Sequence, residues 1–434
     1  MALELKVGST YKSTKGVNFK ILKLLGGGGQ GNVYLIDYNG QKKAFKHYTC
    51  TFNAKEKFIA NLKNNIQRGA PNKAFIWPLD FVADCDDSFG YIMDLRPEGY
   101  YEISDFMLAR AKFTSFKTIV DSCLKIVTAF RALHAIGYSY QDLNDGNFFI
   151  NPTNGDVLIC DNDNVAPDGT NMGVIGKPRY LAPEIVVGNG AVLPNVRTDL
   201  FSLSIILFLV LCMNHPLEGK RWVEAPCMVS PYTDRIYGSQ ALFIFDPNDK
   251  SNEIPKNVKG LGNALKRWPY LPPYIKDIFL KAFSQETIKN PNRRLREIEW
   301  LKALVRFRSE IIKCSCGNEV FMNESNTVKC DGCGKPHKTA NLLKVPEYSF
   351  IATRGTRLYR CQLGMCNVDH ALDPIALIVA KPDNPNVLGL KNVTTLTLKA
   401  YTPSGVVKLV KPQEIIPVKS GIKVEVYDSK LEII

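Results

Sequence analysis

One short row of polar residues limits the chain's fold more than any other feature. It holds Asp142, four intervening residues and Asn147, and Asp161 follows fourteen residues later at the end of an apolar run. One carboxylate can orient a substrate hydroxyl, while a carboxamide and a second carboxylate can hold Mg²⁺ on nucleotide phosphates. Asp-x₄-Asn alone would occur by chance in many proteins. Its weight comes from motifs on either side that follow one another in the order a phosphoryl-transfer site requires.

A glycine-rich row lies upstream and reads G-x-G-x-x-G-x-V at Gly26, Gly28, Gly31 and Val33. Glycines let a turn lie against phosphates because no side chain covers the backbone amides. A flexible turn is the alternative for a lone row of this kind. A dinucleotide-binding fold would place a helix directly after the glycines. Here a strand, a turn and a second strand carrying Lys46 follow instead, which favours a phosphate-covering hairpin.

Lys46 is expected to neutralise the α- and β-phosphates, and it needs a carboxylate partner to hold it. Glu56, within the helical stretch 53–62, is the only Glu in reach of that segment. We expect this pair, with a solvated helix face as the alternative role of Glu56. The adenine side of the pocket is expected to be formed by Ala44, Met93, Asp94 and Leu95, with residues 94–96 as the hinge.

Further motifs follow downstream in order. Residues 157–160 predict a short buried strand that delivers Asp161, and an Ala-Pro-Glu row ends at Glu184. An apolar helix is predicted to open at residues 198–203, and Arg294 comes near the end of the same region. Glu184 and Arg294 sit where a kinase-like C-lobe places a buried ion pair, which is specified by geometry more than by net energy.

These ordered matches cover about 270 residues, and the chain resembles a eukaryotic-type (Hanks-type) Ser/Thr protein kinase. More narrowly, it is similar to the bacterial kinases encoded with tellurite-resistance-type stress operons. The segments that carry this likeness are Phe75–Asp80, Gly90–Arg96, Cys160–Asn164 and His215–Gly219. The resemblance implies ATP and Mg²⁺ as cofactors. It also implies a von Willebrand A-domain protein as partner and a metal-dependent protein phosphatase in the same system.

The chain departs from the kinase pattern in its two catalytic motifs. Tyr140-Gln141 replaces the His-Arg before the catalytic Asp, Asn144 replaces the loop Lys, and residues 161–163 read Asp-Asn-Asp instead of Asp-Phe-Gly. Asp163 is expected to cap the next turn, with a third metal ligand as the alternative. Gln141, in place of the Arg before the catalytic Asp, cannot supply the charge that would bind a phosphate on the following segment, whose single Ser/Thr hydroxyl is Thr170.

The groups that kinase chemistry cannot lack are nevertheless present. Asp142 is expected to orient the hydroxyl, Asn147 and Asp161 to bind Mg²⁺, and Lys46 to hold phosphates. We therefore expect a working Ser/Thr kinase of the non-RD type that phosphorylates itself and a partner in a bacterial stress response. The alternative function is a pseudokinase scaffold that binds nucleotide and docks partners through its C-terminal domains.

Composition limits the other classes of function. A chain of 434 residues exceeds a single core, so two or three domains are expected. The net charge of +13 could indicate nucleic acid, a membrane surface or an acidic partner, but the lysines are dispersed, which favours solubility plus a phosphate-binding cleft. The start lacks the apolar core of a signal peptide, and the most apolar run, 200–213, is too short to span a bilayer. A cytoplasmic protein is expected, with neither a membrane nor nucleic acid as partner.

Four of the twelve cysteines form two close pairs, each trailed by Gly: Cys314, Cys316, Cys330 and Cys333. Their thiolates can meet tetrahedrally around a structural Zn²⁺, which leaves no open position for zinc chemistry. Reduced free cysteines are the alternative. Between the pairs the only aromatic is Phe321 and the charges are few, which argues against a nucleic-acid module.

The tail contains strand-like runs separated by turn signals. The runs are 349–353, 375–379, 393–398, 406–410 and 422–426, and the turn signals are Pro385, Gly389, 404–405 and 420–421. They predict a small β-sandwich. Its size and closing pattern are similar to a forkhead-associated domain. No Gly-Arg or Ser-x-x-His row for reading phosphopeptides is visible, so a degenerate docking module is expected.

The expected fold class is α+β, a bilobal protein-kinase-like fold followed by a zinc ribbon and a small C-terminal β-sandwich. The expected boundaries are 1–309 for the kinase-like domain (N-lobe about 17–96, C-lobe about 97–309), 310–337 for the ribbon, 338–347 for a linker and 348–434 for the sandwich.

Overall fold

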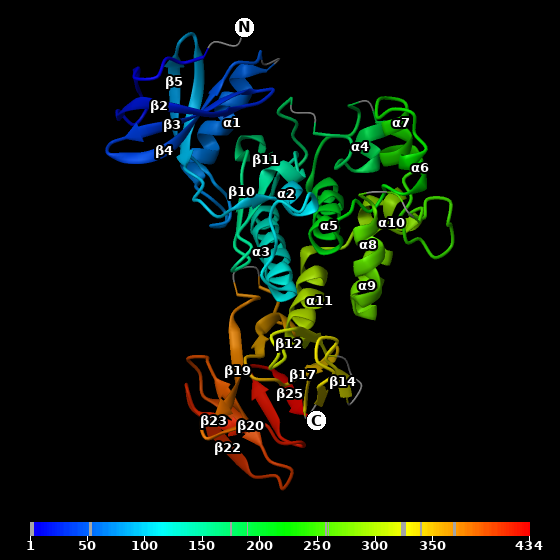
Figure 1. The fold of residues 1–434 in the computed structure, drawn as a ribbon. Helices are drawn as coiled ribbons and strands as arrows, with labels where there is room; N and C mark the ends of the chain where they lie inside the picture. The colour runs from blue at the N-terminus through cyan, green and yellow to red at the C-terminus, as the bar shows by residue number, and fades with distance from the viewer. Residues whose placement is uncertain are drawn as a thin grey trace. The chain divides into compact units, whose positions relative to one another are not determined.

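The computed structural model describes residues 4–51, 54–173, 176–188, 190–256, 258, 260–322, 327–338, 341–367 and 370–434. The chain divides into two compact units (Figure 1). The first comprises Met1–Phe113, Lys125–Pro269 and Phe279–Leu295, and the second comprises Thr114–Leu124, Tyr270–Ile278 and Arg296–Ile434. The division therefore does not follow the boundary expected at residue 309.

The N-terminal part of the first unit is a six-stranded antiparallel sheet in the order β1-β2-β3-β4-β6-β5. Its strands are β1 (Thr10–Lys12), β2 (Asn18–Gly27), β3 (Gly31–Tyr38), β4 (Gln41–Tyr48), β5 (Pro78–Cys85) and β6 (Ser88–Asp94). The strand, turn and returning strand predicted after the glycines are confirmed, because Tyr38 pairs with Gln41 across a two-residue turn. Both turn residues, Asn39 and Gly40, have positive φ, as a tight hairpin requires.

Strand alternation divides the side chains of this sheet between two apolar clusters. Phe45 faces one cluster with Phe19 and Ile36, while its neighbour Ala44 faces the other. Helix α1 (Lys55–Arg68) covers the second face, where Phe58 and Leu62 are buried (Figure 1). The predicted helical stretch began at Asn53, which lies outside the described residues, and the helix extends six residues beyond the expected end at Leu62.

The rest of the first unit is mainly helical and is built around α5 (Val196–Cys212), in which every residue from Thr198 to Cys212 is buried. Asn195 caps this helix by accepting hydrogen bonds from the amides of Arg197 at 2.9 Å and Thr198 at 3.2 Å. The predicted apolar helix is thus a buried core element. Within the described ranges, no helix combines the length and apolar character needed to cross a bilayer.

The other elements of this region are short, apart from α3 (Phe116–Ala135) and α9 (Pro273–Ala282), which span the division between the units. The helices are α2 (Ile103–Met107), α4 (Pro183–Val187), α6 (Lys220–Val223), α7 (Tyr232–Asp234), α8 (Gly262–Arg267) and α10 (Gln285–Lys289). The strands are β7 (Tyr101–Glu102), β8 (Tyr138–Ser139), β9 (Phe148–Ile150), β10 (Val157–Ile159) and β11 (Ala166–Pro167). The single-turn helices are η1 (Asp145–Asn147), η2 (Asn162–Asn164), η3 (Arg235–Ser239), η4 (Trp268–Tyr270) and η5 (Pro291–Arg293).

The second unit contains α11 (Glu297–Glu310), two small hairpins and two larger sheets. The hairpins pair β12 (Ile311–Lys313) with β13 (Glu319–Phe321), and β14 (Thr327–Lys329) with β15 (Pro336–Lys338). Part of the predicted ribbon, residues 323–326, lies outside the described residues. The carboxylate of Glu319 accepts hydrogen bonds from the amides of Phe116 and Lys117 at the start of α3, which satisfies two free donors of that helix.

The two sheets of the tail enclose one apolar core. One has the order β17-β16-β25-β24-β21-β22 and the other the order β18-β19-β20-β23. The strands are β16 (Leu342–Lys344), β17 (Ser349–Ile351), β18 (Arg357–Tyr359), β19 (Pro374–Lys381), β20 (Asn384–Asn392), β21 (Leu398–Tyr401), β22 (Val407–Val410), β23 (Ile415–Pro417), β24 (Lys423–Val426) and β25 (Ser429–Ile433), with η6 (Arg360–Leu363) between β18 and β19.

Two details of the tail differ from the sequence expectation. The segment 338–347 was expected as a linker, but it contains β16, which pairs with β17 and β25; residues 339–340 are outside the described ranges. The run 393–398 was expected as a strand, but residues 393–397 connect β20 to β21 and only Leu398 lies in a strand. The buried Asn392 side chain donates to the carbonyls of Leu396 at 2.8 Å and Val410 at 3.0 Å, so it replaces strand pairing there.

The predicted strand break at Pro385 and Gly389 is also wrong, because both positions lie within β20. A Cβ at Gly389 would lie 2.4 Å from the Ile415 side chain, so glycine is required there by the close approach of β23.

The buried His215 makes the stability of the first unit depend on pH. Its Nε2 bonds the Arg179 carbonyl at 2.8 Å and its Nδ1 accepts from the Leu217 amide at 3.2 Å. Burial lowers the pKa of His215 from 6.5 to about 4, although Glu218 opposes this shift. Between pH 4 and 6.5, the His215 imidazole therefore binds a proton more readily in the unfolded chain than in the folded chain, so acid favours unfolding.

We predict that the first unit loses stability as pH falls from 6.5 toward 4, at up to about 1.4 kcal/mol per pH unit from this residue. Denaturant unfolding across this pH range should show a smaller slope for His215→Gln, because Gln keeps a donor and an acceptor but does not titrate. His370→Gln, at an exposed histidine, is the control. Equal slopes for His215→Gln and wild type would contradict the prediction.

Candidate functional site

The glycine-rich turn joins β2 to β3, and the Gly28 amide donates to the Gly31 carbonyl at 2.9 Å. A Cβ at Gly31 would lie 2.1 Å from the His47 carbonyl oxygen, so chain packing alone requires glycine there. A Cβ at Gly26 or Gly28 would meet no atom within 4 Å. Packing therefore does not explain these two glycines, which is the expected result where a ligand approaches the backbone.

Lys46, on β4, lies at the centre of the site with its side chain buried. Its Nζ donates to Asp163 Oδ2 at 2.9 Å, to Asp161 Oδ1 at 3.2 Å and to Gln30 Oε1 at 3.1 Å. Burial opposes the charge of Lys46, but the two carboxylates outweigh burial and raise its pKa, so the ammonium stays charged. The lysine is thus fixed between the glycine-rich turn and the turn after β10.

Glu56 was expected to hold Lys46, and this prediction is wrong in the structure. Glu56 is exposed in the first turn of α1, and the partners of Lys46 are Asp163 and Asp161. The positions of α1 that face inward carry Asn61 and Asn65, which both donate to the Val165 carbonyl at 2.8 Å. The helix therefore presents amides to the site, and the carboxylate comes from the chain after β10.

Asp163 was expected to cap the next turn, with a third metal ligand as the alternative. Its carboxylate instead contacts three other side chains. Its Oδ2 accepts from Lys46 and from the Tyr48 hydroxyl, and its Oδ1 accepts from the Tyr91 hydroxyl at 3.2 Å. Its side chain is 0% exposed, and these three hydrogen bonds engage both of its oxygens.

Strand geometry explains why the two tyrosines meet Asp163. Tyr48 lies two residues after Lys46 on β4, so both side chains share one face of the sheet. Tyr91 is the register partner of Lys46 on β6. Sequence analysis did not assign either tyrosine, although the i, i+2 spacing of Lys46 and Tyr48 was a usable signal.

The catalytic-loop residues follow β8 and are held by α5. The carboxylate of Asp199 accepts from the amides of Tyr140 at 2.5 Å and Gln141 at 3.2 Å. Asn144 Nδ2 donates to Asp142 Oδ1 at 3.2 Å, and Asn147 Nδ2 donates to the Asp142 carbonyl at 2.9 Å. Asn147 acts through its Nδ2 in this contact, so its Oδ1 remains an acceptor.

Asp142 is partly buried, and burial raises its pKa to about 6, with the charge of Asp161 adding to the shift. A carboxylate with a pKa in this range is ionised at neutral pH and accepts a proton more readily than an ordinary Asp. The hydrogen bond from Asn144 opposes the shift. The group is therefore suited to orient a hydroxyl and accept its proton.

Asn147 and Asp161 are brought together by the pairing of β9 with β10. Phe148 pairs with Ile159, and the Cys160 amide donates to the Asn147 carbonyl at 2.9 Å. Asp161 follows in a left-handed conformation (φ 51°), and its side chain is 42% exposed. A carboxylate oxygen and a carboxamide oxygen are the donors that Mg²⁺ prefers, so these two residues fit that ion.

Three of the four residues predicted for the adenine side, Ala44, Met93 and Leu95, belong to one apolar group. Ala44 and Met93 are cross-strand partners on β4 and β6, and both belong to the cluster covered by α1. Val33 and Leu95 pack against this cluster, as does Leu158, which sequence analysis had not assigned. Asp94 differs, because its carboxylate forms an ion pair with Lys43 at 2.5 Å on the exposed edge.

The segment after Asp161 is anchored at both ends. Near its start, Gln141 Nε2 donates to the Thr170 carbonyl at 2.6 Å, so an uncharged amide holds this segment. At its end, Arg294 contacts Glu184 with Nη1–Oε1 at 2.7 Å and Nη2–Oε2 at 2.6 Å. The predicted Glu184–Arg294 pair is confirmed.

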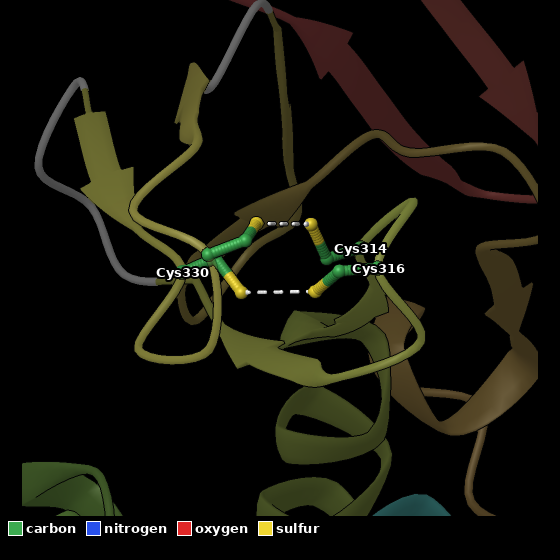
Figure 2. Close-up of side chains that lie close together, drawn as sticks. Cys314, Cys316 and Cys330 are labelled. Carbon is green, nitrogen blue, oxygen red and sulfur yellow. Dashed lines mark hydrogen bonds between the residues drawn. The ribbon is translucent and has the colours of Figure 1, made fainter.

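The four clustered cysteines meet in the second unit (Figure 2). Their sulfur atoms all lie within 4.8 Å of one another, with Cys314–Cys333 and Cys316–Cys330 at 3.6 Å. Thiolates at the corners of a zinc tetrahedron lie about 3.8 Å apart, because each Zn–S bond is about 2.3 Å. A disulfide would require about 2.05 Å. The geometry therefore fits a four-thiolate zinc site, and each hairpin supplies part of it.

Comparisons with known proteins agree with this geometry. The protein kinase domain family matches residues 19–259. The serine/threonine-protein kinase Sgk1 of Xenopus tropicalis is 26% identical over 231 residues, which cover 50% of this chain and 52% of that relative. The serine/threonine-protein kinase PrkC of Bacillus subtilis (strain 168) is 24% identical over 300 residues, which cover 66% of this chain and 40% of that relative. The chain thus spans about half the length of the Sgk1 relatives.

The ion pairs of Lys46 predict unequal effects of two acidic substitutions. Asp163→Asn should cost about 3 kcal/mol of unfolding free energy, because it leaves a buried ammonium short of one counter-charge. Glu56→Gln should change stability by less than about 0.5 kcal/mol, because an exposed charge is lost. Denaturant unfolding of both variants and of wild type measures these differences in unfolding free energy. A larger loss for Glu56→Gln would restore Glu56 as the partner.

Proposed function

This chain belongs to the protein kinase domain family, and we propose that it transfers the γ-phosphoryl group of ATP to Ser or Thr hydroxyls of proteins. The observation that supports this most is the convergence of Asp142, Asn147 and Asp161 beside the charged Lys46. The trio comes from two chain segments whose pairing brings them together. An apolar group next to it suits a purine base.

The chemistry follows from these positions. Asp142 orients the substrate hydroxyl and accepts its proton as the oxygen forms a bond to the γ-phosphorus. The bond from that phosphorus to the bridging oxygen breaks, and ADP leaves with the electron pair. Asn147 and Asp161 would hold Mg²⁺, which supplies positive charge to the phosphate oxygens. Lys46 adds a fixed charge on the nucleotide side.

A narrower proposal concerns the biological setting. We propose that the substrates are the chain itself and a von Willebrand A-domain protein in a bacterial stress system, with a metal-dependent phosphatase as its counterpart. Support comes from the likeness of four segments, among them Cys160–Asn164 and His215–Gly219. The second unit, with its cysteine cluster and β-sheets, would dock such partners.

The test is incubation of the full chain with γ-labelled ATP and Mg²⁺, alone and with the von Willebrand A-domain protein. Wild type should label Ser or Thr, and Asp142→Asn should lower kcat by at least about 10²-fold, because the proton acceptor is lost. Asp145→Asn, in the same loop, is the matched control. A wild type without transfer under Mg²⁺ or Mn²⁺, or an Asp142→Asn variant of full activity, would sink the kinase proposal.

We also propose that the cysteine cluster holds one structural Zn²⁺. Elemental analysis of the full chain should find about one zinc per molecule, because four thiolates make one closed site. Cys314→Ser should remove it, while Cys227→Ser, at an exposed cysteine outside the cluster, should keep it. Zinc-free wild type with unchanged melting temperature would rule the site out.

A further inference from the structure

The catalytic loop lacks a cation where its chemistry needs one. A transferring phosphoryl group carries negative charge on its three equatorial oxygens, and fixed cations next to it lower the barrier. Position 144, two residues after Asp142, is a neutral Asn. Asp142, Asp161 and Asp163 add three negative charges around the same place.

Of three cations near this site, two are already paired in the part of the chain that the structure describes. Lys46 is buried between Asp161 and Asp163. Arg179 makes a two-pronged contact with Glu218 at 2.6 Å and 3.0 Å. The third is Lys177, which is exposed and has no ion pair among the described residues.

Lys177 lies next to Asn144, the uncharged residue of the loop. Its Nζ donates to Asn144 Oδ1 at 3.3 Å, and Asn144 in turn donates to the Asp142 carboxylate at 3.2 Å. The ammonium is thus separated from the hydroxyl-orienting group by one amide. Its positive charge also lowers the pKa of Asp142, opposing the effect of burial.

The backbone fixes this placement. A Cβ at Gly176 would lie 3.3 Å from the Gln141 carbonyl and 3.4 Å from Asp142 Oδ1, so the segment passes the catalytic loop at contact distance. The Tyr180 amide then donates to the Lys177 carbonyl at 2.9 Å and closes a turn. Lys177 therefore starts from an anchored backbone, and only its flexible stem has to adjust.

We propose that Lys177 contacts the phosphoryl group being transferred and supplies the positive charge that Asn144 lacks. The amide of Asn144 holds the ammonium near Asp142 until the nucleotide binds. Lys177 forms and breaks no covalent bond. Its positive charge stays next to the phosphoryl group while that group moves from ADP to the hydroxyl oxygen. This inference rests on the proposed kinase function.

The first experiment measures binding without turnover. Calorimetry on the full chain with Mg²⁺ compares the β,γ-imido analogue of ATP with ADP. Lys177→Met should weaken the analogue about tenfold and leave ADP within about twofold, because a charge-assisted contact to the third phosphate is lost. Lys177→Arg should keep the preference. Lys42→Met, at an exposed lysine of β4, should match wild type.

The second experiment measures phosphoryl transfer and moves the positive charge from position 177 to position 144. Lys177→Met should lower kcat about 10²-fold with an unchanged melting temperature. Adding Asn144→Lys to that variant should recover at least about tenfold, because the cation returns to the same place from the loop side.

The outcomes separate the two proposals. If Lys177→Met keeps wild-type analogue affinity and kcat, or weakens ADP and the analogue equally, the phosphate contact is wrong while the kinase function stands. If wild type transfers no phosphate but its preference for the analogue depends on Lys177, the kinase function fails and the contact stands.

Discussion

The buried contact between Lys46 and Asp163 determines how the rest of the site is arranged. An ammonium in a buried position needs at least one fixed counter-charge, and removing it would leave a costly isolated charge. Here the carboxylate belongs to the same three-residue row as Asp161, the residue suited to Mg²⁺. The buried lysine and the more exposed carboxylate of Asp161 are therefore positioned by one turn. Tyr48 and Tyr91 both donate to the buried Asp163, whereas the side chain of Asp161 is 42% exposed.

Neutral amide side chains occupy several positions where charged side chains would be expected. Asn61 and Asn65 fix α1 to the Val165 carbonyl, and Gln141 fixes the following segment at Thr170. Asn162 donates to the carbonyls of Ile76 at 2.6 Å and Ile159 at 2.8 Å. Amides satisfy buried carbonyls without the desolvation cost of a charge. These hydrogen bonds hold the segments of the site to one another through backbone carbonyls.

Spacing and alternation were enough to predict much of this. The glycine-rich hairpin and the cysteine pairs follow from local rows whose chemistry is specific. The loop trio needed the order of the flanking motifs, and the Glu184–Arg294 pair, 110 residues apart, needed the resemblance to a kinase C-lobe. The partner of Lys46 could not be predicted, because Asp163 lies 117 residues away and the nearer Glu56 satisfies the same pairing rule. The strand predicted at 393–398 failed for a related reason: a buried side chain, Asn392, replaced backbone pairing. Both errors arise where tertiary contacts override a local rule.

The buried hydrogen bonds of the turn at 161–163 also limit which small molecules this site can accept. A compound that needs the turn to move outward must break the Lys46–Asp163 contact together with two tyrosine hydrogen bonds, and it must expose a buried carboxylate. Breaking a buried pair of this kind costs about 3 kcal/mol or more, which is over two orders of magnitude in affinity. A compound confined to the apolar group formed by Ala44, Met93 and Leu158 bears no such cost. Inhibitors of this chain would therefore have to compete with the purine base itself.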